Sequence, residues 1–215
     1  LTRKQELMLC QHWGVPIEEF IVGGDDKTMW CRSIASGAID LNQPLPDDIW
    51  MWLTPPVKAP ATPEQVELTF EAGVPVALNG QKMKLGELIP RLNTIAGRHG
   101  IGLIDVFEDG IMDLKSREIY EAPAAQVILK VKKDLEGACL TKDERQFKKI
   151  VDAKWAYLVY HGEWFHPLKK DLDAFIAESQ KMVNGSTEVK LYKGNIIITK
   201  RDQPKTSLFY PEIRS

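Results

Sequence analysis

The sequence predicts an α+β fold, with a mixed, mainly antiparallel sheet built from hairpins and a long C-terminal helical arm. Alternating segments joined by short Gly-containing turns lie at Val66–Leu78 and again at Glu188–Thr199, and such pairs are typical of β-hairpins. Between them, residues 123–183 carry apolar residues three and four positions apart, which indicates amphipathic helices. Strands followed by helices and then strands again indicate an α+β fold.

The first part of the chain predicts a helix followed by a long irregular tract. Thr2 and Gln5 have the spacing of a capping box, and an apolar stripe follows them, as at the start of a helix. Residues 23–63 are rich in Pro, Gly and Asp and keep no helical or strand period, so we expect loop with short turns. Such a tract is usually functional or wrapped onto another domain, and both alternatives stay open.

The middle of the chain predicts a helix and two strands that bring polar residues together. Leu85–His99 has apolar residues at helical spacing. Leu103–Phe107 is a short apolar stretch that predicts a strand whose end presents Glu108, and Lys115–Tyr120 follows after an Asp-Gly turn. We expect Glu108 and Tyr120 to meet across this strand pair.

Three helices are expected after these strands, at Pro123–Leu140, Thr141–His161 and Pro167–Val183. No basic groove accompanies their aromatic residues, so packing between helices or subunits is favoured over stacking of nucleic-acid bases. The lysines that we interpret as solvated helix faces are Lys130, Lys132, Lys133, Lys148 and Lys149.

The composition is that of an ordinary soluble protein. A chain of 215 residues with 44% hydrophobic residues can bury a substantial core. Its 28 basic and 30 acidic residues are interspersed and give a net charge of −2, so we expect neither nucleic acid nor a membrane as a partner. No apolar run approaches the roughly 20 residues that span a bilayer, and the first residues are too charged for a secretory signal. We therefore expect a cytoplasmic protein.

Neither the cysteines nor the histidines predict a covalent or metal-bound framework. Cys10, Cys31 and Cys139 are an odd number of widely separated thiols, which favours reduced cysteines over disulfides. The four histidines show none of the short spacings of metal motifs. We predict no metal site.

The most informative stretch is Ala96–Gln126, which reads AGRHGIGLIDVFEDGIMDLKSREIYEAPAAQ. It combines glycines, acids, basic residues and a tyrosine where a core needs only apolar spacing, and this density indicates a ligand site. Its order of motifs, from the glycine-rich turn through Ile-Asp, Lys-Ser-Arg and Ile-Tyr-Glu to Ala-Pro-Ala, closely resembles the C-terminal domain of the argininosuccinate synthase family. The opening LTRKQELMLCQHWGVPI, the hairpin ELTFEAGVPVALNG and the arm KWAYLVYHGEWFHPL extend the resemblance along the chain.

The resemblance implies a ligase of arginine biosynthesis and the urea cycle, which joins citrulline to aspartate with ATP and Mg²⁺ and releases AMP and pyrophosphate. The family's SGGxDTS loop, which cradles ATP in an N-terminal domain, does not occur in this sequence. ATP would therefore be bound mainly by that missing domain, and this segment alone would be inactive and would supply no catalytic residue. Residues 1–63 would be the linker helix and irregular segment after the missing domain, and residues 64–215 the C-terminal α+β domain. The family also implies a homotetramer.

The resemblance further implies that citrulline is bound by Ser33, Glu108 and Tyr120, which match the family's serine, glutamate and tyrosine contacts. A carboxylate suits an ammonium group, and hydroxyls orient a carboxylate or an amide without adding charge. The ordinary alternatives are a solvated strand-end acid at Glu108 and a half-buried sheet residue at Tyr120.

Four departures from the family pattern bear on this pocket. Gly24 stands where the family has a serine, Leu103 and Gly110 where it has arginines, and Asp113 where it has a glycine. Such changes alter the local charge around a zwitterionic substrate. They leave open two alternatives: a non-catalytic paralogue or remnant that acts as a binding or assembly module, and a ligase for another amino acid.

Overall fold

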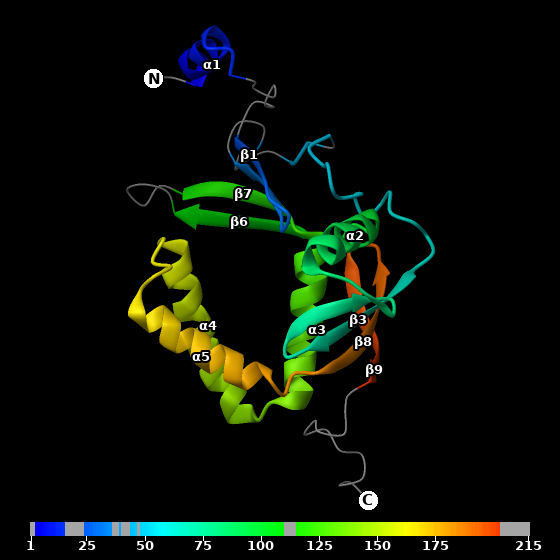
Figure 1. Cartoon of the computed structure of the whole chain (residues 1–215). Helices are drawn as coiled ribbons and strands as arrows, with labels where there is room; N and C mark the ends of the chain where they lie inside the picture. The colour runs from blue at the N-terminus through cyan, green and yellow to red at the C-terminus, as the bar shows by residue number, and fades with distance from the viewer. Residues whose placement is uncertain are drawn as a thin grey trace, which may run out of the picture.

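The computed structural model describes residues 3–15, 24–35, 39, 44–46, 48–109 and 115–202. Within them, two antiparallel sheets flank two helices, and a pair of further helices forms an arm (Figure 1). The elements in chain order are α1 (Arg3–His12), β1 (Gly24–Lys27), β2 (Arg32–Ala35), β3 (Glu64–Glu71), β4 (Val74–Leu78), β5 (Gln81–Lys82), α2 (Leu85–Arg98), β6 (Leu103–Asp109), β7 (Lys115–Glu121), α3 (Pro123–Cys139), α4 (Lys142–Tyr160), α5 (Pro167–Gln180), β8 (Gly185–Tyr192) and β9 (Asn195–Asp202).

The strands divide between two sheets in which every pairing of the described strands is antiparallel. Sheet A has the order β1-β2-β7-β6, and sheet B has the order β5-β4-β3-β8-β9. The predicted α+β class is confirmed, and both hairpins expected from the sequence lie in sheet B, where β3 pairs with β8. The pairing of β2 with β7 crosses the division predicted at residue 63, and that division stays a prediction.

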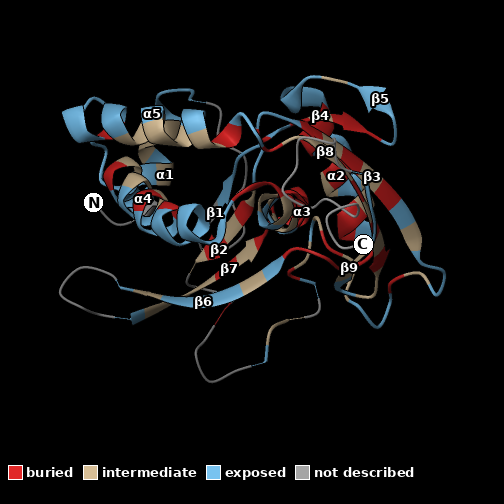
Figure 2. Cartoon of the chain, turned by 90° about the horizontal axis from the view of Figure 1, so that it is seen from below, coloured by how far each residue is buried: buried red, intermediate tan, exposed pale blue. Residues whose placement is uncertain are grey.

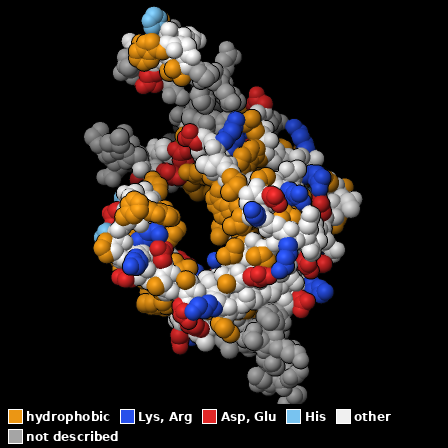
Figure 3. All heavy atoms as spheres, viewed as in Figure 1, with side chains coloured by type: hydrophobic (Ala, Val, Ile, Leu, Met, Phe, Trp, Pro, Cys, Tyr) orange, Lys and Arg blue, Asp and Glu red, His pale blue; other side chains and the backbone are white. Residues whose placement is uncertain are grey.

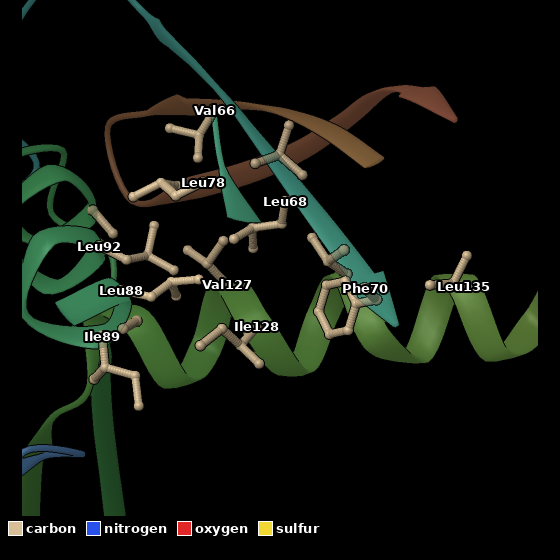
Figure 4. Packing of buried hydrophobic residues seen from close by; sticks show 14 of the residues in the cluster. Val66, Leu68, Phe70, Leu78, Leu88, Ile89, Leu92, Val127, Ile128 and Leu135 are labelled. Carbon is tan, nitrogen blue, oxygen red and sulfur yellow. The ribbon is translucent and has the colours of Figure 1, made fainter. Parts of the chain in front are cut away.

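The main core lies between sheet B and the helices α2 and α3. Figure 4 shows Leu68 and Phe70 of β3 directed toward Val127, Ile128 and their neighbours on α3. These residues are almost completely buried, and each contributes about 1.5–3 kcal/mol by leaving water. The helical spacing of the apolar residues therefore fixes which face of α3 packs against the sheet, and the residues between them remain partly or fully exposed.

Helices α4 and α5 form the arm, which is more exposed than α3 (Figure 2). The Thr141 hydroxyl accepts from the backbone N–H of Glu144, whose carboxylate bonds back to Thr141, and this capping box starts α4. Edge-to-face contact of Phe147 with Phe175, with ring centroids 5.3 Å apart, joins the two helices. The three predicted helices are confirmed, although α5 ends at Gln180 rather than at Val183.

The prediction of loop throughout residues 23–63 was wrong for two short strands, β1 and β2. Four-residue strands give too few alternations to be recognised, and the GDDK sequence of β1 contains residues that strands usually avoid. Pairing with β7 and burial of Ile34 override that local preference. The described residues beyond β2, up to residue 63, include neither helix nor strand, as expected.

A buried ion pair fastens this irregular segment to sheet A. The Arg32 guanidinium donates to Glu121 Oε2 at 2.5 Å and to the Ile49 carbonyl at 2.7 Å. The Glu121 carboxylate also accepts from the backbone N–H groups of Trp52 at 2.9 Å and Leu53 at 2.8 Å. Because Arg32 and Glu121 are at most 2% exposed, these bonds are needed to offset the cost of burying both charges.

No helix in the part of the chain that the structure describes is both long and apolar enough to cross a bilayer.

Candidate functional site

The three residues predicted to bind citrulline lie on one face of sheet A. Ser33 of β2 is paired with Tyr120 of β7, and Tyr120 is paired on its other side with Ile104 of β6. Glu108 lies four residues after Ile104 on the same strand. Because side chains alternate between faces with a period of two, Ser33, Glu108 and Tyr120 point to the same side of the sheet.

Glu108 and Tyr120 are in direct contact. The Tyr120 hydroxyl donates a hydrogen bond to Glu108 Oε1, although the two residues are on different strands. Both side chains are partly buried. Burial, and then the hydrogen bond to Glu108 and its negative charge, raise the pKa of Tyr120 well above its usual value. The phenol therefore remains a hydrogen-bond donor at all ordinary pH values, and the expected meeting of these residues is confirmed.

Glu118 adds a second carboxylate to this face of the sheet. It is paired with Ala35 of β2 and Val106 of β6, two residues before Tyr120, and its Oε1 accepts from the Ser116 hydroxyl at 3.2 Å. Burial, and then the negative charges of Glu108 and Asp26, raise the pKa of Glu118. The carboxylates of this face thus repel one another, and such an arrangement favours a ligand with a cationic group.

Sequence reasoning did not single out Glu118. The signal for it was the strand period, because a residue two positions before Tyr120 must share its face. The sequence predicts a strand whose end presents Glu108, and β6 runs slightly further, to Asp109, so that Glu108 lies within the ladder, opposite Ser116. A ladder position fixes the Glu108 backbone more firmly than a loop position would.

The departures from the family pattern fall in different places. Gly24 is paired with Ala35, so a side chain at position 24 would share the face of Ser33. Leu103 is paired with Glu121 and lies on the opposite face. Its replacement of an arginine therefore does not change the face that carries Tyr120. Gly110 and Asp113 lie outside the described residues.

The described part of the chain holds no group of three or more residues suited to ligate a metal ion. Cys10, Cys31 and Cys139 are free cysteines, of which Cys139 is buried.

The two antiparallel sheets and their helices form an α+β domain, and one face of sheet A carries a hydrogen-bonded carboxylate and phenol beside Ser33. Residues 24–215 match the family model described as "Arginosuccinate synthase C-terminal domain", and the chain belongs to this family.

Relatives named argininosuccinate synthase align with nearly the whole chain. The protein of Pyrococcus furiosus is 48% identical over 202 residues, which cover 94% of this chain and 49% of the relative. The protein of Rubrobacter xylanophilus is 43% identical over 209 residues, which cover 95% of this chain and 51% of the relative. The chain therefore spans about half the length of the curated relatives it matches.

Proposed function

We propose that this chain is the citrulline-binding C-terminal part of an ATP-dependent ligase that joins citrulline and aspartate into argininosuccinate, with release of AMP and pyrophosphate. The observation that carries the proposal is the hydrogen-bonded pair of Glu108 and Tyr120 on the face that also carries Ser33. Membership of the family supports the choice of substrate.

Each of the three residues has a role suited to citrulline, which is zwitterionic at its amino-acid end and neutral at its ureido end. The Glu108 oxygen that does not face Tyr120 can accept from the α-ammonium group. The hydroxyls of Ser33 and Tyr120 can orient the carboxylate or the ureido group without adding charge. Fixing the amino-acid end in this way would hold the ureido oxygen in position for reaction.

ATP and Mg²⁺ are assigned to the other half of the complete enzyme. The sequence has no SGGxDTS loop, and no residue of this chain is assigned to either ligand. By this proposal the chain alone turns over no ATP. The proposed location is the cytoplasm, where free thiols such as Cys31 remain reduced.

The arm is the proposed contact for a homo-oligomer, which is a tetramer for the complete enzyme. Ile150, Tyr160 and Phe165 are between 66% and 94% exposed, and apolar surface of this kind marks protein interfaces. Size-exclusion chromatography with light scattering tests this assignment. A strict monomer for the complete protein would contradict it.

The ligase proposal is tested with a fusion protein in which the N-terminal half of the Pyrococcus furiosus relative precedes this chain. We expect pyrophosphate release that requires citrulline and aspartate together, and none from this chain alone. Glu108→Gln in the same fusion should remove most of the activity. Formation of argininosuccinate by the chain alone, or release from the fusion that ignores citrulline, would contradict the proposal. Citrulline binding to the chain, followed by thermal shift, gives a readout that does not depend on the fusion.

A second candidate function is a non-catalytic binding or assembly module, and Gly24 is the observation that favours it. A family serine at this position would add a hydroxyl to the face of Ser33, and the glycine removes that contact. If the pocket is only weakened, Gly24→Ser should increase citrulline affinity severalfold, by about one hydrogen bond. If neither the original chain nor this variant binds citrulline, the module is favoured. A ligase for another amino acid is the remaining alternative. A thermal-shift screen tests it, because a different amino acid would then raise the melting temperature more than citrulline does.

A further inference from the structure

A groove of about 1120 Å³ lies where the arm meets the rest of the molecule. Its walls come from α3, α4, α5 and the turn between β3 and β4. Figure 3 shows the opening between the arm and the body, with hydrophobic side chains along its sides. Ser33, Glu108 and Tyr120 are not among the residues that line the groove, so the groove is separate from the proposed citrulline site.

The groove has apolar walls. Leu129 of α3, Ile176 of α5 and Val74 at the start of β4 line it, together with Trp155. Leu129 and Val74 are 57% and 45% exposed, so these walls are in contact with solvent. Burial of an apolar ligand here would be favourable by about 25 cal/mol for each Å² removed from water.

One lysine of the groove already has its charge compensated. Lys148 is only 6% exposed, and its Nζ lies 2.6 Å from Asp152 Oδ2 and 3.4 Å from Glu136 Oε1. Glu136 Oε1 also accepts from the Gln180 side-chain amide at 3.1 Å. The prediction that Lys148 belongs to a solvated helix face was therefore wrong, since its side chain is buried and paired with acids of α3 and α4.

Lys132, on the facing side of α3, is not compensated in this way. It lines the groove and is partly buried, yet among the described residues it makes neither a hydrogen bond nor a salt bridge. Burial, together with the nearby charge of Lys148, lowers the pKa of Lys132, while Glu136 and Asp152 oppose that shift. Both of these acids are bonded to Lys148. The three donors of the Lys132 ammonium are thus available to a ligand.

The charges around the groove are predominantly positive. The cationic residues that line it are Lys132, Lys133, Lys142, Arg145, Lys148 and Lys149. Three acids line it, and all three are engaged in bonds to lysines: Glu136 and Asp152 to Lys148, and Asp173 to Lys169 at 2.8 Å. Such a groove complements a ligand with one anionic end and an apolar body.

We propose that this groove binds a free aliphatic monocarboxylate, with its carboxylate on Lys132 and its hydrocarbon chain against Leu129, Val74 and Ile176. A single carboxylate supplies the charge-assisted hydrogen bonds that Lys132 lacks. A neutral or cationic molecule with the same hydrocarbon chain supplies no anionic acceptor for the Lys132 ammonium.

Calorimetry with octanoate on the full chain tests this assignment, with octanol and octylamine as probes of the same chain length. We expect octanoate to bind at one site and to quench the fluorescence of Trp155, and the other two to bind at least about tenfold more weakly. Lys132→Met keeps the aliphatic part of the side chain and should weaken octanoate binding by about tenfold or more. The matched control is Lys130→Met, because Lys130 is exposed on the same helix and does not line the groove.

Several results would overturn the proposal. If octanol binds as tightly as octanoate, Lys132 plays no part in binding. The same conclusion follows if Lys132→Met and Lys130→Met change octanoate affinity equally while circular dichroism shows both variants to be folded. No octanoate binding at millimolar concentrations would also overturn it. Light scattering tests whether the chain self-associates. If it does, and Lys132→Met abolishes the association, the groove binds a second copy of the chain instead. Citrulline binding is measured in parallel, so failure here is distinguishable from failure of the ligase proposal.

Discussion

The two faces of sheet A are built from the same strands, yet they differ in how their charged residues are satisfied. Neighbouring residues, such as Tyr120 and Glu121, point to opposite faces. On one face, Glu121 is fully buried and accepts from Arg32 and from three consecutive backbone N–H groups. On the other face, Glu108 is partly exposed and accepts from the phenol of Tyr120.

The difference separates a structural carboxylate from one suited to a ligand. An ionised carboxylate can accept about four hydrogen bonds. Groups of the protein itself donate the hydrogen bonds that the Glu121 carboxylate accepts. The Glu108 carboxylate accepts a bond from the Tyr120 hydroxyl and can accept further bonds from a ligand. Removal of Glu121 should therefore affect stability above all, and removal of Glu108 should affect binding above all.

The largest expected effect comes from Glu121→Gln. The amide brings an N–H₂ group toward backbone N–H donors and removes the negative charge that faces the buried Arg32 guanidinium. Breaking a buried pair in this way costs about 3–5 kcal/mol, and we expect that loss in urea unfolding. The matched control is Glu71→Gln, which breaks the exposed pair with Lys82 and should cost no more than about 1 kcal/mol. Equal losses for the two variants would remove the structural role assigned to Glu121.

The next effect is that of Glu108→Gln on citrulline affinity. The amide oxygen can still accept from Tyr120, so the local geometry is kept while the charge is removed. Loss of a charge-assisted bond to the ammonium group should weaken binding roughly 10- to 100-fold, with a change in stability below about 1 kcal/mol. Calorimetry and urea unfolding of the same samples measure both quantities. An unchanged citrulline affinity, or a stability loss as large as that of Glu121→Gln, would contradict the proposal that Glu108 serves binding and Glu121 serves stability.

Much of this fold was predictable from local patterns. The hairpins of sheet B, the helix α2 and the three helices α3, α4 and α5 each have enough residues to repeat their apolar period several times. The contact between Glu108 and Tyr120 was also predictable, because an Asp-Gly sequence between two strand-like stretches predicts an antiparallel pair.

The strand that carries Ser33 was not predictable in the same way. The pattern of β2, with Arg32 and Ile34 buried, becomes meaningful only when Glu121 is known to lie opposite Arg32. That pairing joins residues 89 positions apart, and no local pattern reports it. Long-range contact also explains the missed burial of Lys148, because its ion pair with Glu136 joins α4 to α3.

A smaller effect on the open face is expected from Tyr120→Phe. The variant keeps the ring and removes the donor to Glu108. Loss of one hydrogen bond near the ligand should weaken citrulline binding about 2- to 10-fold, less than Glu108→Gln does. Calorimetry at one pH ranks the two variants. A larger loss for Tyr120→Phe would mean that the phenol, rather than the carboxylate, is the principal contact on this face.

The smallest effect concerns Glu118 and the pH dependence of stability. Burial, with the charges of Glu108 and Asp26, raises the pKa of Glu118 in the folded chain, so ionised Glu118 opposes folding at neutral pH. As the pH falls through the raised pKa, the folded chain takes up the proton, and this cost disappears below the ordinary pKa of a glutamate. Glu118→Gln should therefore raise the melting temperature near about pH 7 by up to about 3 °C, with a gain that vanishes near about pH 4. Thermal unfolding of this variant beside Glu87→Gln, in which an exposed carboxylate is replaced, tests the difference. A gain that persists in acid would show that repulsion among the carboxylates of this face does not cause it.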